Sequence, residues 1–201
     1  MGYKRKSWKH IAFVFLLSFT LAVITSLGTT ILMRKTNLGL ALILLLVIVI
    51  INIGFDVIGT AATAATEQPH HAKAANKVPG ARQTVFLVRH ADTVANFTND
   101  IVGDVTGAIS GGMSASIVLE IIRTYPALEV HEIWIDTLLI ALVASVTVTG
   151  KAAGKTFAIQ KADEIIGQVG SLTARIEDLT GWTMTDKKRK GGKRHGNSRK
   201  N

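Results

Sequence analysis

Residues 96–116 read NFTNDIVGDVTGAISGGMSAS, and this stretch, which contains neither Lys nor Arg, decides how we expect the chain to fold. Its small and polar residues recur every three or four positions, so they form one stripe on a helix. The stripe comprises Asn96, Asp100, Gly103, Asp104, Gly107, Ser110, Gly111 and Ser114. A stripe this polar is unsuited to lipid, so we expect this helix at the centre of a bundle. A helix end that dips into the headgroups is the alternative.

Two features of the stripe indicate close helix packing and an acidic side chain that needs a partner. Gly103, Gly107 and Gly111 form two overlapping GxxxG units, which predict that a neighbouring helix packs against the backbone there. Asp104 would lie at membrane depth, where an acidic side chain costs roughly 2.5 to 3.5 kcal/mol. We therefore expect Asp104 to have a partner or a function.

The apolar residues of the chain occur in blocks that match the roughly 20 residues needed to cross a bilayer. We predict an all-α integral membrane protein whose bundle covers residues 11–158. Its four transmembrane helices are expected at about residues 11–33, 38–60, 101–122 and 133–150. A signal peptide is the alternative for the first of them. The chain has no cysteine, which excludes disulfides, thiolate metal sites and thiol catalysis.

Positive charge is concentrated on one predicted side of the membrane. Of the 23 Lys and Arg residues, 20 lie in the basic N-terminus (1–10), between the second and third spans, or after residue 150. Because Lys and Arg favour cytoplasmic loops, we predict a multi-pass protein of the cell membrane with both termini cytoplasmic. This topology accounts for the net charge of +9, so we expect no specific nucleic-acid partner.

Residues 67–98 are polar enough to leave the bilayer core, and we predict that they form a cytoplasmic connector of two short helices. His70 and His71 are adjacent and would point apart on a helix, so we interpret them as a solvated turn in preference to a metal pair.

Residues 87–96, LVRHADTVAN, resemble the opening strand and turn of the histidine phosphatases and phosphoglycerate mutases. In that family the histidine that His90 matches is the phosphorylated nucleophile, and the arginine that Arg89 matches binds phosphate. Ala91 stands where glycine is usual. The chemistry also requires a second arginine, a general acid and another histidine on a parallel sheet. A membrane segment follows instead, so we predict that the chain is not an enzyme.

The end of the chain combines an amphipathic segment with a basic tail. Residues 162–182 predict a juxtamembrane helix whose apolar stripe comprises Ile165, Val169, Leu172, Ile176 and Leu179. This stripe could lie on the membrane, pack on the bundle or pair with a second copy. Residues 187–201, KKRKGGKRHGNSRKN, are too charged to fold alone, and we expect a disordered tail that binds anionic lipid headgroups or only sets topology and solubility.

From Phe55 to Ile176 the chain resembles the transmembrane domain of the CorB/CorC (cyclin M) magnesium and cobalt transporters. Gly59, Thr60 and Ala61 stand where that family has a Ser-Gly-Ser-Glu type stretch, and Gly103 and Asp104 stand in place of a Gly-Asn pair. Residues 150–158, GKAAGKTFA, resemble the family's Gly-Glu-x-x-Pro-Lys-x-x-Ala at the end of its last membrane helix.

The resemblance implies a bundle of three membrane helices that works as a dimer and holds a dehydrated cation. The first span would then be an additional helix, and we expect no nucleotide-binding CBS domains. Lys151 replaces the family's glutamate, Gly154 replaces its proline, and no acid stands near Thr60 at the glutamate position of the Ser-Gly-Ser-Glu type stretch. These departures indicate a degenerate ion site.

The resemblance also implies where an ion site would lie. The candidate ion-site or intramembrane polar residues are Thr60, Asn99, Asp100, Gly103, Asp104 and Lys151, of which Thr60, Asp100 and Asp104 would ligate Mg²⁺. Relative to the family, Asp104 stands in place of a neutral Asn and Lys151 in place of the glutamate. We therefore predict that the Lys151 ammonium pairs with Asp104 and occupies the site. The alternative is that Lys151 points to the headgroups. We predict magnesium or cobalt transport, or a non-transporting membrane scaffold or regulatory protein, with the lipid bilayer and a second copy as partners.

Overall fold

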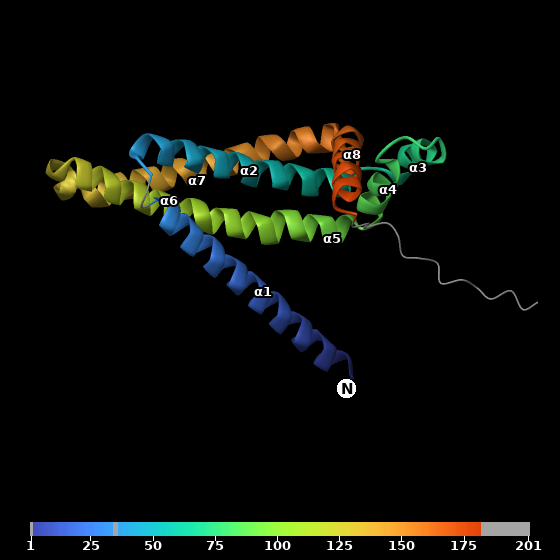
Figure 1. Ribbon diagram of the computed structural model, residues 1–201, viewed down its shortest axis with the longest axis horizontal. Coiled ribbons are helices and arrows are strands. Elements are labelled where there is room, and N and C mark those ends of the chain that lie inside the picture. Colours follow the sequence, from blue (N-terminus) through green and yellow to red (C-terminus); the bar gives the residue numbers. More distant parts are fainter. Residues whose placement is uncertain (1, 34–35, 182–201) are drawn as a thin grey trace, which may run out of the picture.

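The computed structural model describes residues 2–33 and 36–181, and all regular structure in these residues is helical (Figure 1). The elements in chain order are α1 Gly2–Met33, α2 Leu38–Ala64, α3 Glu67–Ala75, α4 Ala81–Arg89, α5 Ala91–Ala95, the π-helix η1 Asn96–Val102, α6 Gly103–Thr124, the 3₁₀-helix η2 Pro126–His131, α7 Glu132–Gln160 and α8 Ala162–Thr180. The predicted tail at 187–201 lies outside the described residues, as do Arg34, Lys35 and Trp182.

Four helical stretches of the described residues are long and apolar enough to cross a membrane. They are Phe15–Met33, Leu38–Ala64, Ala91–Thr124 and Pro126–Gln160. The predicted fold class, an all-helical chain with four candidate membrane helices, is therefore confirmed. Their orientation in a membrane stays a prediction.

The third and fourth of these stretches extend beyond their predicted limits of 101–122 and 133–150. The third is continuous from α5 through η1 into α6, because the polar residues at its start bond to their own helix, as Thr98 Oγ1 does to the Val94 carbonyl at 2.9 Å. The fourth continues past Gly150 to Gln160 as α7. The Ala-rich residues that follow Gly150 favour helix, and a single glycine costs only about 1 kcal/mol there.

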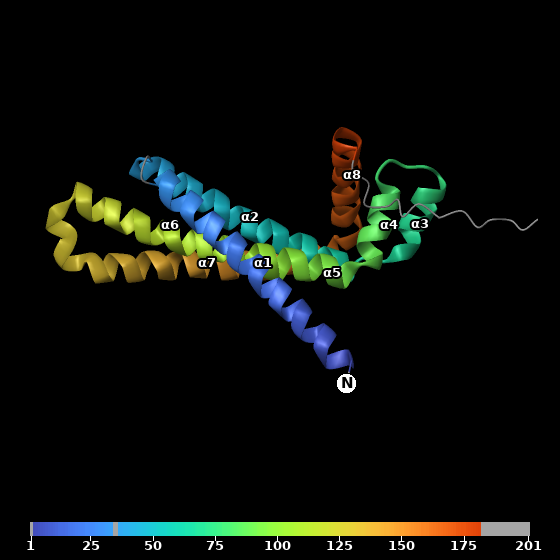
Figure 2. The same ribbon diagram turned by 60° about the horizontal axis from the view of Figure 1, so that its bottom comes forward.

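The spans pack around α6, which contacts α1, α2 and α7. The apolar core between α2 and α6 is formed by Ala41, Leu45, Met113 and Ile117. In both views α1 leaves the bundle at an angle, while α2, α6 and α7 run alongside one another (Figures 1 and 2). The prediction that the glycine-rich helix is central to the bundle agrees with these contacts.

The end of the bundle at which α3, α4 and α8 lie is called the connector end here. At this end α8 stands across the direction of α2 and α7, between the bundle and α3 with α4 (Figure 2). Ala62, Leu87 and Ile166 form a second apolar core that joins α2, α4 and α8. Short side chains allow this close packing, since a Cβ on Gly170 would lie 2.8 Å from the Thr84 nitrogen.

Candidate functional site

The most deeply buried acidic side chain within a candidate span is that of Asp56 on α2, which is 4% exposed. Asn52, one helical turn earlier, is also 4% exposed and shares its face of α2. Among the described residues, neither Asn52 Oδ1 nor Asp56 Oδ2 has a hydrogen-bond partner. Since buried polar atoms are nearly always satisfied, these two oxygens mark a candidate functional site.

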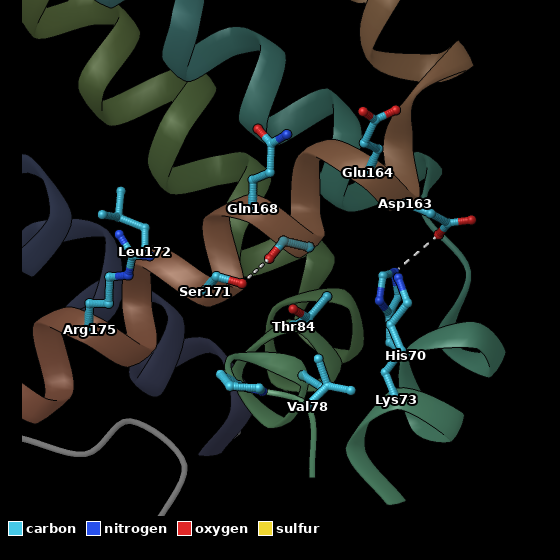
Figure 3. Close-up of a pocket in the computed structure, with 13 residues that line it drawn as sticks. His70, Lys73, Val78, Thr84, Asp163, Glu164, Gln168, Ser171, Leu172 and Arg175 are labelled. Carbon is cyan, nitrogen blue, oxygen red and sulfur yellow. Dashed lines mark hydrogen bonds and ion pairs between the residues drawn. The ribbon is translucent and has the colours of Figure 1, made fainter. Parts of the chain in front are cut away.

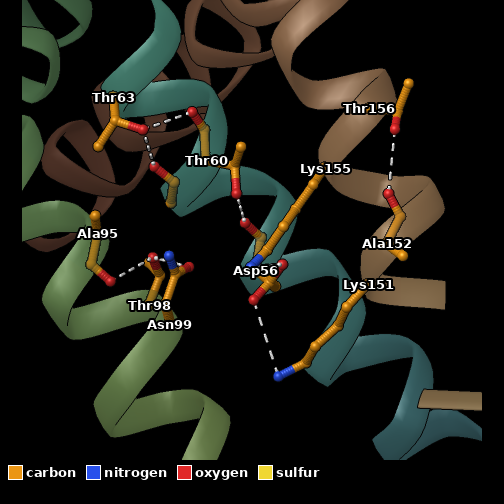
Figure 4. Close-up of polar contacts among 11 residues, drawn as sticks. Asp56, Thr60, Thr63, Ala95, Thr98, Asn99, Lys151, Ala152, Lys155 and Thr156 are labelled. Carbon is orange, nitrogen blue, oxygen red and sulfur yellow. Dashed lines mark hydrogen bonds and ion pairs between the residues drawn. The ribbon is translucent and has the colours of Figure 1, made fainter. Parts of the chain in front are cut away.

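Two lysines of α7 approach the Asp56 carboxylate (Figure 4). Lys151 Nζ lies 3.9 Å from Asp56 Oδ1, and Lys155 Nζ lies 3.7 Å from Asp56 Oδ2. Both distances exceed the 2.7 to 2.9 Å or so of a charge-assisted hydrogen bond. The contacts are therefore ion pairs without hydrogen bonds, and they place two ammonium groups beside one carboxylate.

Two glycines bring α7 close enough for these lysines to reach α2. A Cβ on Gly150 would collide with the Ile53 side chain, and a Cβ on Gly154 would lie 2.7 Å from Val57 Cγ2. Because each lysine directly follows one of these glycines, the close helix contact sets both lysines at its edge. Small residues four apart are a usual means of close helix packing in membranes.

The π-helix η1 forms the third wall of the site. Thr98 and Asn99 pack so closely on Gly59 of α2 that any Cβ there would overlap their side chains. A Cβ on Gly103, at the end of η1, would lie 3.7 Å from Lys151 Nζ and 3.8 Å from Asn52 Oδ1. Short π-helical segments are frequently found at functional sites, which fits this position. We define the Asp56 site as Asn52, Asp56, Gly103, Lys151 and Lys155.

The structure brings only part of the predicted ion site together. Gly103 and Lys151 line the Asp56 site, and Asn99 lies beside it, where its Oδ1 accepts from the Thr98 hydroxyl at 3.3 Å. The Thr60 hydroxyl donates to the Asp56 carbonyl at 2.8 Å, so it satisfies its own helix. The side chains of Asp100 and Asp104 are exposed.

The predicted pairing of Lys151 with Asp104 is wrong, because Lys151 pairs with Asp56. The error arises because the expected stripe is wider than the buried face of α6. Successive residues of an α-helix lie about 100° apart, so Asp104 does not share the direction of the buried Gly103. Gly103, Ser110 and Ser114 are buried, whereas Asp104, Gly107 and Gly111 are exposed.

Of the three glycines expected to pack against a neighbouring helix, only Gly103 has such contacts with described residues. A Cβ on Gly107 or Gly111 would have no described heavy atom within 4 Å, so no described helix of the chain packs on them. In the described ranges, no group of three or more His, Cys, Asp or Glu could hold a metal ion. Magnesium binding by Thr60, Asp100 and Asp104 stays a prediction.

Sequence reasoning missed Asn52, Asp56 and Lys155 as site residues. A signal was present, since Asn52 and Asp56 are the polar residues one turn apart in an otherwise apolar span. Their importance depends on α7, whose contact with α2 the sequence pattern does not encode.

His70 differs from the interpretation of the histidine pair as solvated, whereas His71 is exposed. His70 is 1% exposed, and its Nε2 lies 3.3 Å from Asp163 Oδ1 at the start of α8 (Figure 3). These two residues help to line a cavity of about 450 Å³ between α3, α4 and α8. The His70 ring packs against α8, since a Cβ on Gly167 would lie 3.9 Å from His70 Cε1. This packing is not visible in the local sequence.

The Asp163 carboxylate ties the connector to α8. Burial alone would raise the pKa of Asp163, but hydrogen bonds from the Thr66 amide at 2.9 Å and from His70 hold that pKa below its usual value. On the connector surface, hydrogen bonds from Arg89 and then His71 lower the pKa of Glu67. Arg89 of α4 therefore forms an ion pair with Glu67 of α3.

The VRHADTVAN segment does not adopt a strand followed by a turn. Arg89 ends α4, and His90 separates α4 from α5 with its Nδ1 donating to the Phe86 carbonyl at 2.9 Å. The described residues contain no strand that could carry a phosphatase site. Whether the chain has enzymatic activity stays a prediction.

Comparison of the chain with protein-family models, with curated proteins and with solved structures found no match. The resemblance to the CorB/CorC membrane domain therefore stays a prediction, and the Asp56 site is the structural feature that bears on function.

Proposed function

We propose that this protein binds a small cation at the Asp56 site within a membrane-spanning bundle and takes part in cation transport. The observation that carries the proposal is a buried carboxylate, 4% exposed, in a candidate span. Ionisable residues inside membrane segments are costly and are usually retained for a function. Asp56 follows the start of α2 by about 27 Å at 1.5 Å per residue, which is near the far edge of a roughly 30 Å hydrocarbon core.

In the described state, the ammonium groups of Lys151 and Lys155 take the place that a bound cation would have beside Asp56. Lys155 is half-exposed, and the long stem of a lysine allows its ammonium to move toward headgroups and water. When the lysines leave, Asp56 Oδ2 and Asn52 Oδ1 become available, and oxygen ligands suit hard cations such as Mg²⁺. Because two ammonium groups outnumber one carboxylate, a divalent cation can enter only after a lysine has moved away.

This proposal keeps the degenerate ion site expected from the CorB/CorC resemblance but moves its acid from Asp104 to Asp56. Transport of magnesium or cobalt across the cell membrane, with both termini cytoplasmic, is the corresponding physiological role. A second copy would complete the assembly that the resemblance implies.

A membrane scaffold is the second candidate function, and the same ion pairs favour it. If the lysines never leave, Asp56, Lys151 and Lys155 join α2 to α7 permanently, and the site has no ligand. The two candidates differ in what happens when the lysines are removed.

The test is binding calorimetry on purified protein with Mg²⁺ and Co²⁺. The double variant Lys151→Met, Lys155→Met should bind a divalent cation more tightly than the wild type, and adding Asp56→Asn should abolish that binding. Lys161→Met is the matched control, because Lys161 pairs with Glu164 at the α7–α8 corner, away from Asp56.

Thermal unfolding of the double variant distinguishes the scaffold proposal from the transport proposal. Removing both lysines leaves a buried carboxylate without a counter-charge, which typically costs 3 to 5 kcal/mol or so. On the transport proposal, added Mg²⁺ or Co²⁺ restores part of the lost stability. A double variant that is destabilised, binds no cation and does not regain stability with Mg²⁺ or Co²⁺ would refute the cation site. That result would show that the ion pairs only join α2 to α7. Flux into reconstituted vesicles then shows whether binding leads to transport.

A further inference from the structure

The helix α8 has two faces with different surroundings. On one face, Ile166 is fully buried in the core with Ala62 and Leu87, and Gly170 packs against α4. The other face carries Leu172, Ile176 and Leu179, which are 57%, 51% and 87% exposed. Residues at these spacings lie on one side of a helix, so the chain leaves an apolar stripe uncovered over the C-terminal half of α8.

The direction of α8 limits what can cover this stripe. The helix stands across the direction of α2 and α7 in both views (Figures 1 and 2). If α2 and α7 cross a bilayer, a helix perpendicular to them lies parallel to the membrane plane.

The level of α8 along the bundle places it at the membrane surface. The 29 residues of α7 extend over about 43 Å, compared with about 30 Å for a hydrocarbon core and 40 to 45 Å with both headgroup layers. The corner at Lys161, where α8 follows α7, therefore reaches the headgroup layer. Phe157 and Ile159, just before the corner, are exposed apolar side chains, so the apolar surface of α7 extends to this level.

The charges near the stripe are those expected at a headgroup layer. Lys155 in the last part of α7, Lys161 at the corner and Arg175 on α8 are exposed cations. Basic residues beside an apolar stripe favour a bilayer with anionic lipids. Three side chains also provide only part of the roughly 800 Å² per partner that a stable protein interface buries, which disfavours a second copy.

We propose that α8 is an interfacial membrane helix whose stripe of Leu172, Ile176 and Leu179 inserts into the headgroup and acyl boundary of the leaflet at the connector end. The bilayer thus holds α8, and through its contacts with α2 and α4 the connector, at a set height. This inference depends on the membrane-spanning bundle but not on cation binding at Asp56.

Spin labelling tests the insertion directly, and the chain suits it because it has no native cysteine. Cysteines are introduced singly at Leu172, Ile176 and Leu179. The exposed Glu164 and Asp178, which lie about 90° and about 130° around α8 from the stripe, are the control positions. Full-length protein is reconstituted into vesicles of phosphatidylcholine with phosphatidylglycerol. The accessibility of each label to oxygen, which partitions into lipid, is compared with its accessibility to a water-soluble nickel chelate.

Labels on the stripe should be more accessible to oxygen than to the nickel chelate, and the order should reverse at both control positions. Equal exposure of stripe and control labels to the chelate would overturn the proposal. Stripe labels shielded from both reagents, with dipolar coupling between molecules, would also overturn it and assign the stripe to a second copy. Wild-type thermal stability of each variant in detergent confirms that the labelled proteins are folded.

Discussion

Gly154 of α7 faces Val57 of α2 so closely that a Cβ at position 154 would lie 2.7 Å from Val57 Cγ2. Val57 cannot easily turn aside, because β-branched side chains have one strongly preferred rotamer in a helix. The distance between α2 and α7, and with it the reach of Lys155 to Asp56, therefore depends on the absence of a side chain at position 154.

Replacing Gly154 with Ala should separate α2 from α7 and lower stability by about 1 to 3 kcal/mol, the usual cost of overpacking. Gly107→Ala is the matched control, since a Cβ at position 107 meets no described heavy atom within 4 Å. The control should be neutral or stabilising by up to about 1 kcal/mol, because Ala favours helix over Gly. Thermal unfolding in detergent measures both, and equal shifts in the two variants would contradict the close contact.

Gly80→Ala should loosen the connector from α8. Gly80 has a positive φ of 79°, and its Cβ would collide with the Ser171 backbone. Gly181→Ala is the control, because Gly181 also has a positive φ of 68° but no described heavy atom near its Cβ position. Both variants lose roughly 1 to 2 kcal/mol from backbone strain, and only Gly80→Ala adds a steric clash.

Limited trypsin digestion reports the difference between these two variants. Cleavage after Lys77 and Arg82, on either side of Gly80, should be faster in Gly80→Ala than in the wild type or in Gly181→Ala. Similar cleavage rates in both variants would mean that the contact with Ser171 does not hold the connector.

Acid should weaken the attachment of the connector to α8 through Asp163. Its pKa is lower in the folded protein than in the unfolded chain, because the Thr66 amide and His70 bond to the ionised carboxylate against the effect of burial. A lowered folded pKa adds stability above the unfolded value of about 3.9, and that stability is lost as the pH falls through the folded pKa. The effect is modest, since the Asp163 side chain is half-exposed.

The melting temperature measured from neutral pH to below about pH 4 tests this sign. Asp163→Asn should be less stable than the wild type at neutral pH, and the difference should shrink on acidification. A difference that grows on acidification would contradict the direction of the pKa shift.

The predicted orientation of the spans can be tested by cysteine labelling, again without background from native thiols. Tyr125, between α6 and η2, and Lys77, between α3 and α4, are exposed and lie in loops at opposite ends of the bundle. A membrane-impermeant maleimide should label Tyr125→Cys in intact cells and Lys77→Cys only after permeabilisation. The reverse pattern would place both termini outside.

The sequence alone predicted the existence of four apolar spans and of a helix after them, although the third and fourth spans extend beyond their predicted limits. A long uncharged stretch predicts a membrane helix because the relevant length is set by the bilayer and the composition is local, so Leu38–Ala64 was recognisable without any tertiary information. The end of α8 was recognisable to within two residues, since its periodicity stops near Gly181, which takes the left-handed conformation of a helix C-cap.

Only the tertiary structure decided which polar groups meet. Asp56 and Lys151 are far apart in the sequence, and their contact depends on how α2 and α7 are rotated about their axes. That rotation is set by the packing of Gly150 and Gly154 on α2, whereas the sequence directed attention to the glycines of α6. The face of α6 that packs against the bundle includes Gly103, whereas the adjacent Asp104, about 100° around the helix, is exposed. Local periodicity predicts which residues share a face of one helix, but the partner of that face is chosen by packing between helices.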